Sequence, residues 1–163
     1  MKTTTAAVAC FVTSLLTACG GAAAQSNAKA VADALTGEEK LAAEKSPECR
    51  LFTPVELAKY AGESLGPGRV AAMGTGCQWL ARGDASVLIQ VAPARYHEPH
   101  KGAPGFRPIP DVGTRGFVEQ SMGAWNAGAI TGEKTVVVSV SGKGASDATA
   151  IALLKETIAR RAK

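Results

Sequence analysis

Residues 124–141 read AWNAGAITGEKTVVVSVS, and this stretch predicts an antiparallel hairpin. Within residues 135–141, Val136, Val138 and Val140 point one way, and the residues between them point the other way. Thr131-Gly132-Glu133-Lys134 offers the small polar residues that a tight hairpin turn requires. Residues 124–131 are rich in Gly and Ala, and they form the partner strand of this hairpin. One sheet face is therefore strongly apolar.

Further strands are expected on both sides of a second hairpin, earlier in the chain. Residues 76–80 and 86–92 predict its two strands, since Val87, Ile89 and Val91 alternate with Leu88 and Gln90, and Arg82-Gly83-Asp84 lies at the turn. Residues 69–73 predict a short strand, and residues 117–122 predict another. Together with the hairpin of residues 124–141, this indicates an antiparallel sheet of about five to six strands.

Two helices flank these strands. Thr53-Pro54-Val55-Glu56 has the spacing of a capping box with proline at the first helical position, and it predicts a helix ending near Gly62. A second helix starts at Ser146 or Asp147, and we expect its buried side chains to follow a three-four spacing: Ile151, Leu154 and Ile158. The fold class is therefore α+β, with two helices packed on one face of the sheet.

The amino-terminal segment carries an export signal. Lys2 precedes an apolar run over residues 6–16. This run is about 11 residues long, which fits a secretory signal, whereas a transmembrane helix needs about 20. Leu16-Thr17-Ala18-Cys19 follows. This order resembles the lipobox of bacterial type II signal peptides. The resemblance implies cleavage before Cys19, a diacylglycerol thioether on Cys19, and palmitate or another acyl chain on the new amino terminus.

The resemblance sets the expected domain organisation. Residues 1–18 are the signal peptide, residues 19–47 are the lipidated cysteine with its tether and spacer, and residues 48–163 are a single α+β domain. The lipid on Cys19 would attach the protein to the cell membrane or outer membrane, facing the periplasm or the exterior. Gly20 follows Cys19. Because an Asp at that position tends to retain Gram-negative lipoproteins in the inner membrane, Gly20 implies outer-membrane delivery in a Gram-negative source.

Two cysteines remain in the exported chain once Cys10 leaves with the signal and Cys19 is lipidated. Cys49 and Cys77 should form a disulfide in an oxidising compartment, closing a loop of about 29 residues. The alternative is a pair of buried free thiols. Cys77 and Trp79 share a strand face, so we expect Trp79 to pack beside the disulfide.

A further resemblance covers most of residues 48–163. Cys49-x-Leu51 before a Thr-Pro-x-Glu cap, followed by Gly76-Cys77-x-Trp79, is similar to a class of small disulfide-containing bacterial lipoprotein domains of unknown function. The resemblance implies the disulfide and the order of the elements, and it brings no activity. The chain departs from the class at Asp111, where Gly is expected.

His97-Glu98-Pro99-His100 is the densest cluster of metal-ligating residue types. His97 and His100 are only weak candidates for Zn²⁺ or Cu²⁺ ligands, because Pro99 prevents a regular helix and the chain has no other histidine. The alternative is a solvated loop. We predict no metal, no cofactor and no catalytic residue, because no nucleophile is spaced with a base in a recognisable motif.

The proline-rich loop over residues 93–110 is the candidate partner-binding segment, since long loops are often functional. It carries the residue types found in interface hot spots. The candidate residues are Arg95, Tyr96, His97, Phe106 and Arg107. The alternative is a loop without a role.

The net charge of +4 lacks the dense basic stripe of a nucleic-acid-binding protein, so we expect no nucleic-acid partner. The sequence favours a lipid-anchored, non-catalytic binding module whose partner is an envelope protein or the cell wall. One alternative is a periplasmic inhibitor or immunity lipoprotein acting against a cell-wall-attacking enzyme. A second alternative is a metal-dependent enzyme that uses His97 and His100.

Overall fold

A seven-stranded antiparallel sheet runs through the middle of the structure, in the strand order β1-β2-β3-β7-β6-β5-β4. The computed structural model describes residues 37, 40 and 42–163, which belong to a compact unit spanning Thr36–Lys163. In chain order the strands are β1 (Arg69–Ala71), β2 (Gly76–Leu80), β3 (Ser86–Pro93), β4 (Arg107–Pro108), β5 (Thr114–Ser121), β6 (Ala124–Thr131) and β7 (Lys134–Ser141).

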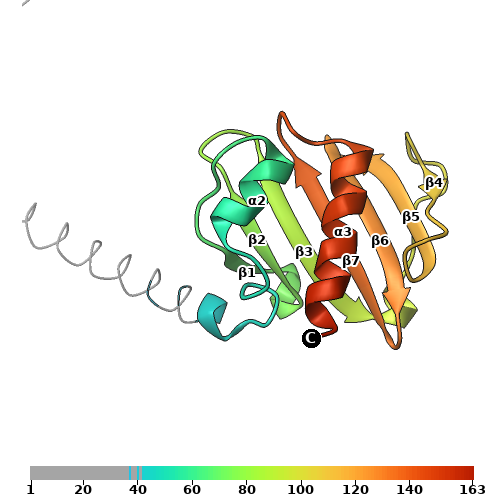
Figure 1. Ribbon diagram of the computed structural model, residues 1–163, viewed down its shortest axis with the longest axis horizontal. Coiled ribbons are helices and arrows are strands. Elements are labelled where there is room, and N and C mark those ends of the chain that lie inside the picture. Colours follow the sequence, from blue (N-terminus) through green and yellow to red (C-terminus); the bar gives the residue numbers. More distant parts are fainter. Residues whose placement is uncertain (1–36, 38–39, 41) are drawn as a thin grey trace, which may run out of the picture. The chain divides into compact units, whose positions relative to one another are not determined.

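Two helices, α2 (Pro54–Ala61) and α3 (Asp147–Arg161), cover one face of this sheet (Figure 1). Two short 3₁₀ turns, η1 (Ala72–Gly74) and η2 (Ala94–Tyr96), follow β1 and β3. The predicted α+β class, with an antiparallel sheet and helices on one face, is confirmed. The additional strand is β4, a two-residue strand ending in proline that is too short to show any alternation.

The hairpin predicted from residues 124–141 forms as β6 and β7, in a continuous register from Trp125↔Val140 to Thr131↔Lys134. Gly132 at its turn has a φ of 59°, in the left-handed region that glycine adopts without strain. The register places every second valine of β7 on the helix-facing side, where these valines are buried. The central position of β7 in the sheet thus follows from its apolar face.

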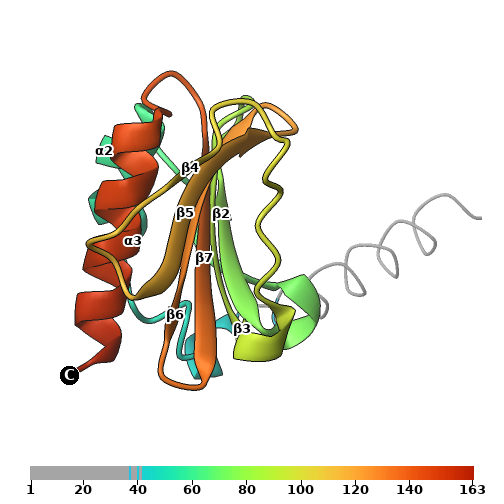
Figure 2. The same cartoon turned by 90° about the vertical axis from the view of Figure 1, so that its right-hand side faces the viewer.

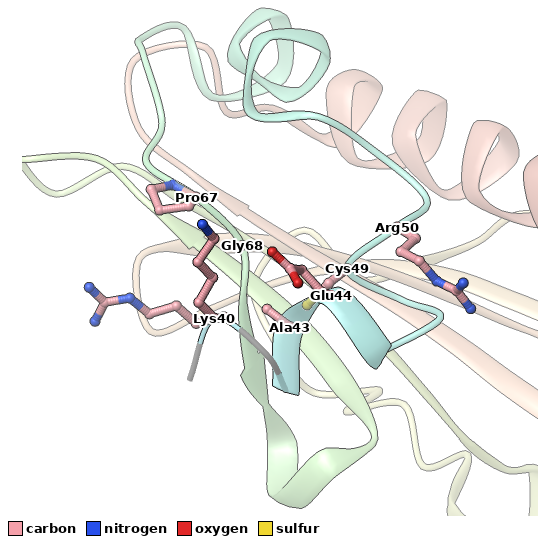
Figure 3. A pocket seen from close by; sticks show the side chains of 8 residues that line it. Lys40, Ala43, Glu44, Cys49, Arg50, Pro67 and Gly68 are labelled. Atoms are coloured by element: carbon pink, nitrogen blue, oxygen red, sulfur yellow. The ribbon is translucent and has the colours of Figure 1, made fainter. Parts of the chain in front are cut away.

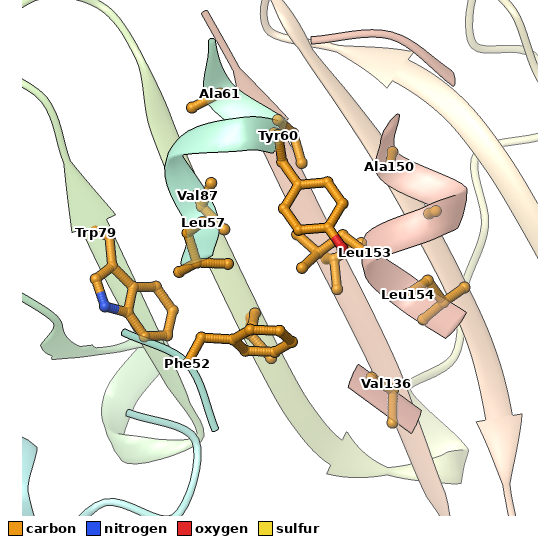
Figure 4. Close-up of a cluster of buried hydrophobic side chains, with 14 of the residues drawn as sticks. Phe52, Leu57, Tyr60, Ala61, Trp79, Val87, Val136, Ala150, Leu153 and Leu154 are labelled. Atoms are coloured by element: carbon orange, nitrogen blue, oxygen red, sulfur yellow. The ribbon is translucent and has the colours of Figure 1, made fainter. Parts of the chain in front are cut away.

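The core lies between the sheet and the two helices (Figure 4). Leu57 of α2 and Leu153 and Leu154 of α3 are fully buried against valines of β3 and β7. Each side chain of this kind contributes about 1.5–3 kcal/mol when it is fully removed from water. This packing fixes α2 and α3 on the sheet.

The start of α2 forms as the sequence predicts. The Thr53 hydroxyl accepts a hydrogen bond from the Glu56 N–H, and the Glu56 carboxylate accepts one from the Thr53 N–H. Phe52 immediately precedes the cap and is buried with Leu57, the arrangement of a hydrophobic staple. Gly62 ends the helix with a φ of 77°.

The buried stripe of α3 differs from the prediction. Of the two residues predicted as possible caps, Ser146 caps the helix, but Ile151 and Ile158 are only half-buried. The fully buried positions are Ala150, Leu153, Leu154 and Thr157. The predicted stripe was right at Leu154, but at its two isoleucines it was one residue out of phase with the buried positions Ala150 and Thr157. The Thr157 hydroxyl donates to the Leu153 carbonyl 2.7 Å away, so it can be buried without an unmet hydrogen bond.

The loop after β3 wraps around the β5 edge of the sheet. It first runs along the face opposite the helices and then crosses to the helix side (Figure 2). The Gln120 N–H donates to the Pro104 carbonyl on the way, and Ile109 and Val112 are buried in the core. The loop therefore completes the domain and covers one sheet edge.

The folded domain also begins earlier than Glu48, the expected boundary. Ser46 and Glu48 are both buried, and Glu48 forms a 3.1 Å ion pair with Arg161 at the end of α3. This burial could not be predicted from the sequence, because both residues are polar and the ion pair joins the two ends of the domain. A Gly20–Lys163 fragment contains the whole compact unit, including its core and both paired cysteines.

Candidate binding surfaces

The disulfide between Cys49 and Cys77 joins the segment before α2 to strand β2, as predicted (Cα–Cα distance 5.0 Å). Trp79 lies on the same face of β2 and is 1% exposed. Gly68 passes so close to both that an added Cβ would lie 2.8 Å from Cys77 Sγ and from Trp79 Nε1. The disulfide thus holds the chain entry, β2 and the segment before β1 in one packed unit.

A cleft of about 560 Å³ opens beside this disulfide (Figure 3). Its walls come from three segments: the helical turn that includes Ala43 and Glu44, the chain at Cys49 and Arg50, and the chain at residues 67–69. The lining residues are Lys40, Ala43, Glu44, Cys49, Arg50, Pro67, Gly68 and Arg69. The sequence could not reveal this cleft, because only the fold and the disulfide bring these segments together.

Arg95 and Tyr96 are two exposed members of the predicted partner-binding loop. Both belong to η2, where the Arg95 guanidinium lies 4.7 Å from the centre of the Tyr96 ring. Tyr96 is 62% exposed. The Ala94 N–H donates to the Glu133 carbonyl, which fixes η2 next to the β6–β7 turn. These two side chains therefore stand on an anchored turn at one end of the sheet.

His97 does not share that exposure, so it cannot contact a partner as the sequence analysis proposed for it. It is 4% exposed, and its ring packs edge-on against Phe117 with centroids 5.4 Å apart. Nδ1 lies 2.8 Å from Thr135 Oγ1, and Nε2 lies 2.9 Å from the Arg115 carbonyl oxygen. Both ring nitrogens are therefore occupied by the protein itself.

The His100 side chain is exposed. The backbone N–H of His100 donates a hydrogen bond to the buried carboxylate of Glu119. Within the described residues, no group of three or more His, Cys, Asp or Glu side chains is placed to hold a metal ion. The weak metal candidates His97 and His100 thus have different roles, one inside the domain and one on its surface.

Phe106 and Arg107 lie away from Tyr96. Phe106 is half-buried, and Arg107 forms a 2.8 Å ion pair with Asp147 at the start of α3. This ion pair lowers the pKa of Asp147. The five candidate loop residues therefore do not form one continuous patch. They divide into an exposed pair at η2, a buried histidine, and a pair that helps fasten the loop to the helix side.

The sheet face opposite the helices carries a surface that the sequence analysis missed. Neighbouring strands place Gln78 beside Leu88, Leu88 beside Ser139, and Ser139 beside Asn126. The same face also presents Leu80, Ser86, Gln90, Ile130, Val137 and Ser141. In β2, β3, β6 and β7 no charged side chain points to this side; Glu119 of the neighbouring strand β5 does, but it is buried there and accepts a hydrogen bond from the His100 backbone N–H. We call this surface the open face.

Two hydrogen bonds order part of the open face. Ser86 Oγ and Ser141 Oγ lie 3.0 Å apart, and Ser141 Oγ also donates to the Asp84 carbonyl. Most side chains of the open face are half-buried by their neighbours, and Leu80 is exposed. The sequence predicted which residues of each hairpin share a face. It could not predict that the two hairpins present these residues on one common face, because that depends on the register between β3 and β7.

A cluster of charges ties α2 to α3. Arg160 binds Glu56 at 2.8 Å and Glu156 at 2.6 Å, and its guanidinium lies 4.0 Å from the centre of the Phe52 ring. The Tyr60 hydroxyl and the Lys59 ammonium group donate to Glu156 as well. Every carboxylate of this cluster has a cationic partner, so the arrangement serves to hold the two helices together.

The pKa values in this cluster shift as that role requires. The hydrogen bond from Arg160, followed by those from Thr53, lowers the pKa of Glu56 from 4.5 to about 2. The hydrogen bond from Tyr60, followed by those from Arg160 and Lys59, lowers the pKa of Glu156. Burial, together with the Glu156 carboxylate, raises the pKa of Tyr60. Both glutamates therefore stay ionised at neutral pH.

No protein-family model matches the chain, and neither a curated protein nor a solved structure matches it. None of the helices in the described part of the chain is long and apolar enough to cross a bilayer. The predicted lipidation site, Cys19, lies outside the described residues. The function must therefore be argued from the chemistry of the surfaces themselves.

Proposed function

We propose that this chain is an exported, lipid-anchored binding module that holds a protein partner on its open face. The observation that carries the proposal is the lack of charge on that face across β2, β3, β6 and β7. The buried centre of a protein–protein interface is depleted of charged residues, because each charge would have to be desolvated. Exposed strand positions without such a role readily accommodate Lys and Glu, which also discourage unwanted pairing.

The chemistry of the open face favours a protein partner. Leu88, Val137 and Ile130 supply apolar area, while the amides of Gln78, Gln90 and Asn126 supply donors and acceptors without a net charge. A partner segment can therefore pack on this face and satisfy its own polar groups there. The exposed Tyr96 at η2 would extend the contact beyond one end of the sheet.

The anchor is the second part of the proposal. Leu16-Thr17-Ala18-Cys19 supports lipidation at Cys19, and the apolar run before it supports export. The Cys49–Cys77 disulfide agrees with an oxidising compartment outside the cytosol.

In a cell-fractionation experiment, the native chain should sediment with membranes, and a Cys19→Ser variant should be released from them. Equal membrane association of both proteins would contradict the anchor.

The binding role is tested by capture from a membrane and periplasm extract of the source bacterium. The bait is the Gly20–Lys163 fragment, and mass spectrometry identifies retained proteins. A Ser139→Lys variant places a charge in the middle of the open face, so it should lose the partner. Ala159→Lys places the same charge on an exposed position of α3 and is the matched control.

Thermal unfolding must first show that both variants are as stable as the unmodified fragment. A partner retained by the native and Ala159→Lys baits but not by Ser139→Lys supports the open face as the binding site. A partner retained equally by all three would place the interface elsewhere. If no protein is retained above a control domain, the proposal of a protein partner fails.

A further inference from the structure

The open face has the chemistry of a surface that can bind its own copy. Its polar side chains in β2, β3, β6 and β7 are hydroxyls and amides, and each of these groups both donates and accepts hydrogen bonds. They include Gln78, Ser86, Gln90, Asn126, Ser139 and Ser141. In a contact between identical surfaces, a charged side chain near the symmetry axis meets its own copy and is repelled. These four strands place no charge on the face, so no such repulsion opposes self-association.

The loop after β3 limits where a second copy can sit. His97 packs on Phe117 of β5, and the His100 backbone N–H donates to Glu119 of the same strand. Figure 2 shows this loop on the side of the sheet opposite the helices. The loop therefore covers the β5 side of the sheet, and the sheet of a second copy must meet the uncovered strands β2, β3 and β7.

This covered side selects one symmetry. Two identical sheets packed face to face with aligned strands are related by a two-fold axis between them, which runs either along or across the strands. An axis across the strands would bring the loop over β5 against the same loop of the other copy. An axis along the strands, between β3 and β7, brings that loop opposite β1, which has only three residues. Only the axis along the strands avoids the collision.

The strand register then determines which side chains face each other. One row across β2, β3, β7 and β6 consists of Gln78, Leu88, Ser139 and Asn126. A two-fold axis along the strands reverses this row in the other copy, so Gln78 faces the partner's Asn126, amide against amide. In a neighbouring row, Ser86 faces the partner's Ser141, hydroxyl against hydroxyl. Groups that can satisfy each other's hydrogen bonds therefore meet across the contact.

We infer that the open face binds a second copy of this chain in a symmetric dimer whose two-fold axis runs along the strands. The inference rests on the proposed binding role of that face and names its partner. Such an axis leaves each end of one sheet beside the same end of the other sheet. Both compact units, which begin at Thr36, therefore start on the same side of the dimer. This arrangement suits two chains that are anchored in one membrane.

The size of the contact decides how the dimer must be measured. Four strands about 4.8 Å apart, with about six free residues each, present roughly 20 Å by 20 Å, or about 400 Å² per chain. A stable protein interface buries about 800 Å² per partner. The dimer should therefore be weak in dilute solution and well populated in the membrane, where anchoring raises the effective concentration. The test accordingly uses the whole chain in the membrane of the source bacterium.

Cysteine cross-linking in intact membranes tests the dimer and its axis. Two copies with different tags are produced together, one carrying Gln78→Cys and the other Asn126→Cys, and a short bis-maleimide is added. We expect a covalent dimer at least about tenfold more abundant than for Ala159→Cys in both copies, an exposed α3 position that reports random collision. Gln78→Cys in both copies should cross-link no better than this control. Equal products from all pairs overturn the dimer, and a stronger Gln78→Cys self-pair overturns the axis.

A charge exchange separates a direct contact from a damaged fold. Ser139 lies on β7, next to the axis, so Ser139→Lys in both copies brings two like charges together. This should reduce the cross-link between positions 78 and 126 at least about tenfold. Ser139→Lys in one copy and Ser139→Glu in the other should restore the cross-link, which misfolded chains could not do. Undiminished cross-linking with two lysines, or no restoration by the opposite charges, overturns the dimer.

The outcomes also distinguish the dimer from the proposed function. If the specific cross-link is absent but the capture experiment retains a different protein that Ser139→Lys loses, the open face is a binding site and its partner is not a second copy. If the cross-link is absent and no protein is retained, both the dimer and the proposed function fail. A specific cross-link that the opposite charges restore supports both.

Discussion

Arg160 Nη2 lies 2.8 Å from Glu56 Oε1, so the last turn of α3 is tied to the first turn of α2. The lowered pKa of Glu56, about 2, makes this contact sensitive to acid. A carboxylate with a lowered pKa contributes stability that is fully present above its unfolded-state pKa and is lost as the pH falls towards the folded-state value.

The first prediction concerns acid. The stabilisation from Glu56 should be complete above about pH 4.5 and should disappear between about pH 4.5 and 2. Glu56→Gln should therefore melt at a lower temperature than the native chain at neutral pH, and the two melting temperatures should converge at low pH. Thermal unfolding followed by circular dichroism over this range provides the measurement. A constant difference at every pH would show that the ionised carboxylate is not the source.

The second prediction concerns the disulfide. Replacing both Cys49 and Cys77 by Ser should reduce the free energy of unfolding by about 3–4 kcal/mol, the chain-entropy value for a loop of this length. Urea denaturation of the two proteins under non-reducing conditions measures the difference. Adding a reductant to the native fragment should reproduce most of the loss. If the reductant changes nothing, the two thiols are not paired in the exported protein.

The third prediction compares two apolar residues of the same helix. Leu57→Ala should reduce stability by about 2–5 kcal/mol, because Leu57 is fully buried between α2 and the sheet. Val55, which is 83% exposed, should tolerate Ala within about 0.5 kcal/mol. Chemical denaturation of both variants decides the matter. Similar losses in the two proteins would mean that α2 is not docked as described.

The fourth prediction uses two glycines. Gly68→Ala should destabilise the domain by about 1–3 kcal/mol, since the added methyl group meets Cys77 Sγ and Trp79 Nε1 at 2.8 Å. Gly83→Ala adds the same group at the β2–β3 turn, where its nearest neighbour is Glu63 Oε2 at 3.7 Å, and should have little effect. The melting temperatures of the two variants give the comparison, and Gly83→Ala being the worse variant would refute it.

The fifth prediction concerns the two histidines. His97→Ala should reduce the free energy of unfolding by about 1–3 kcal/mol, because Thr135 Oγ1 and the Arg115 carbonyl lose their buried partner. His100→Ala, on an exposed side chain, should change it by less than about 0.5 kcal/mol. Urea denaturation separates these outcomes. Equal small effects would indicate that His97 is solvated after all.

The local features of the fold were predictable from sequence, and the features made by distant segments were not. The capping box at Thr53, a cap at Ser146 or Asp147 and the turn at Gly132 depend on a few adjacent residues, so their signals are complete in the sequence. The burial of His97 depends on Thr135 and Phe117, which only the folded sheet brings to it.

The same reason explains what was missed at the binding surfaces. The open face requires the pairing between β3 and β7, which are separated by the long loop. The cleft requires the Cys49–Cys77 link and the approach of Gly68 to it. Composition showed only that the chain is mildly basic, and it could not show which segments line the cleft.

The two outermost strands of the sheet are its shortest: β1 has three residues and β4 has two. Neither offers enough free backbone hydrogen-bonding groups to template a strand from another molecule. A protein confined to a membrane surface, as we propose for this chain, meets its own copies far more often than one free in three dimensions. Such blunt edges would allow dense lateral crowding without end-to-end polymerisation into fibrils.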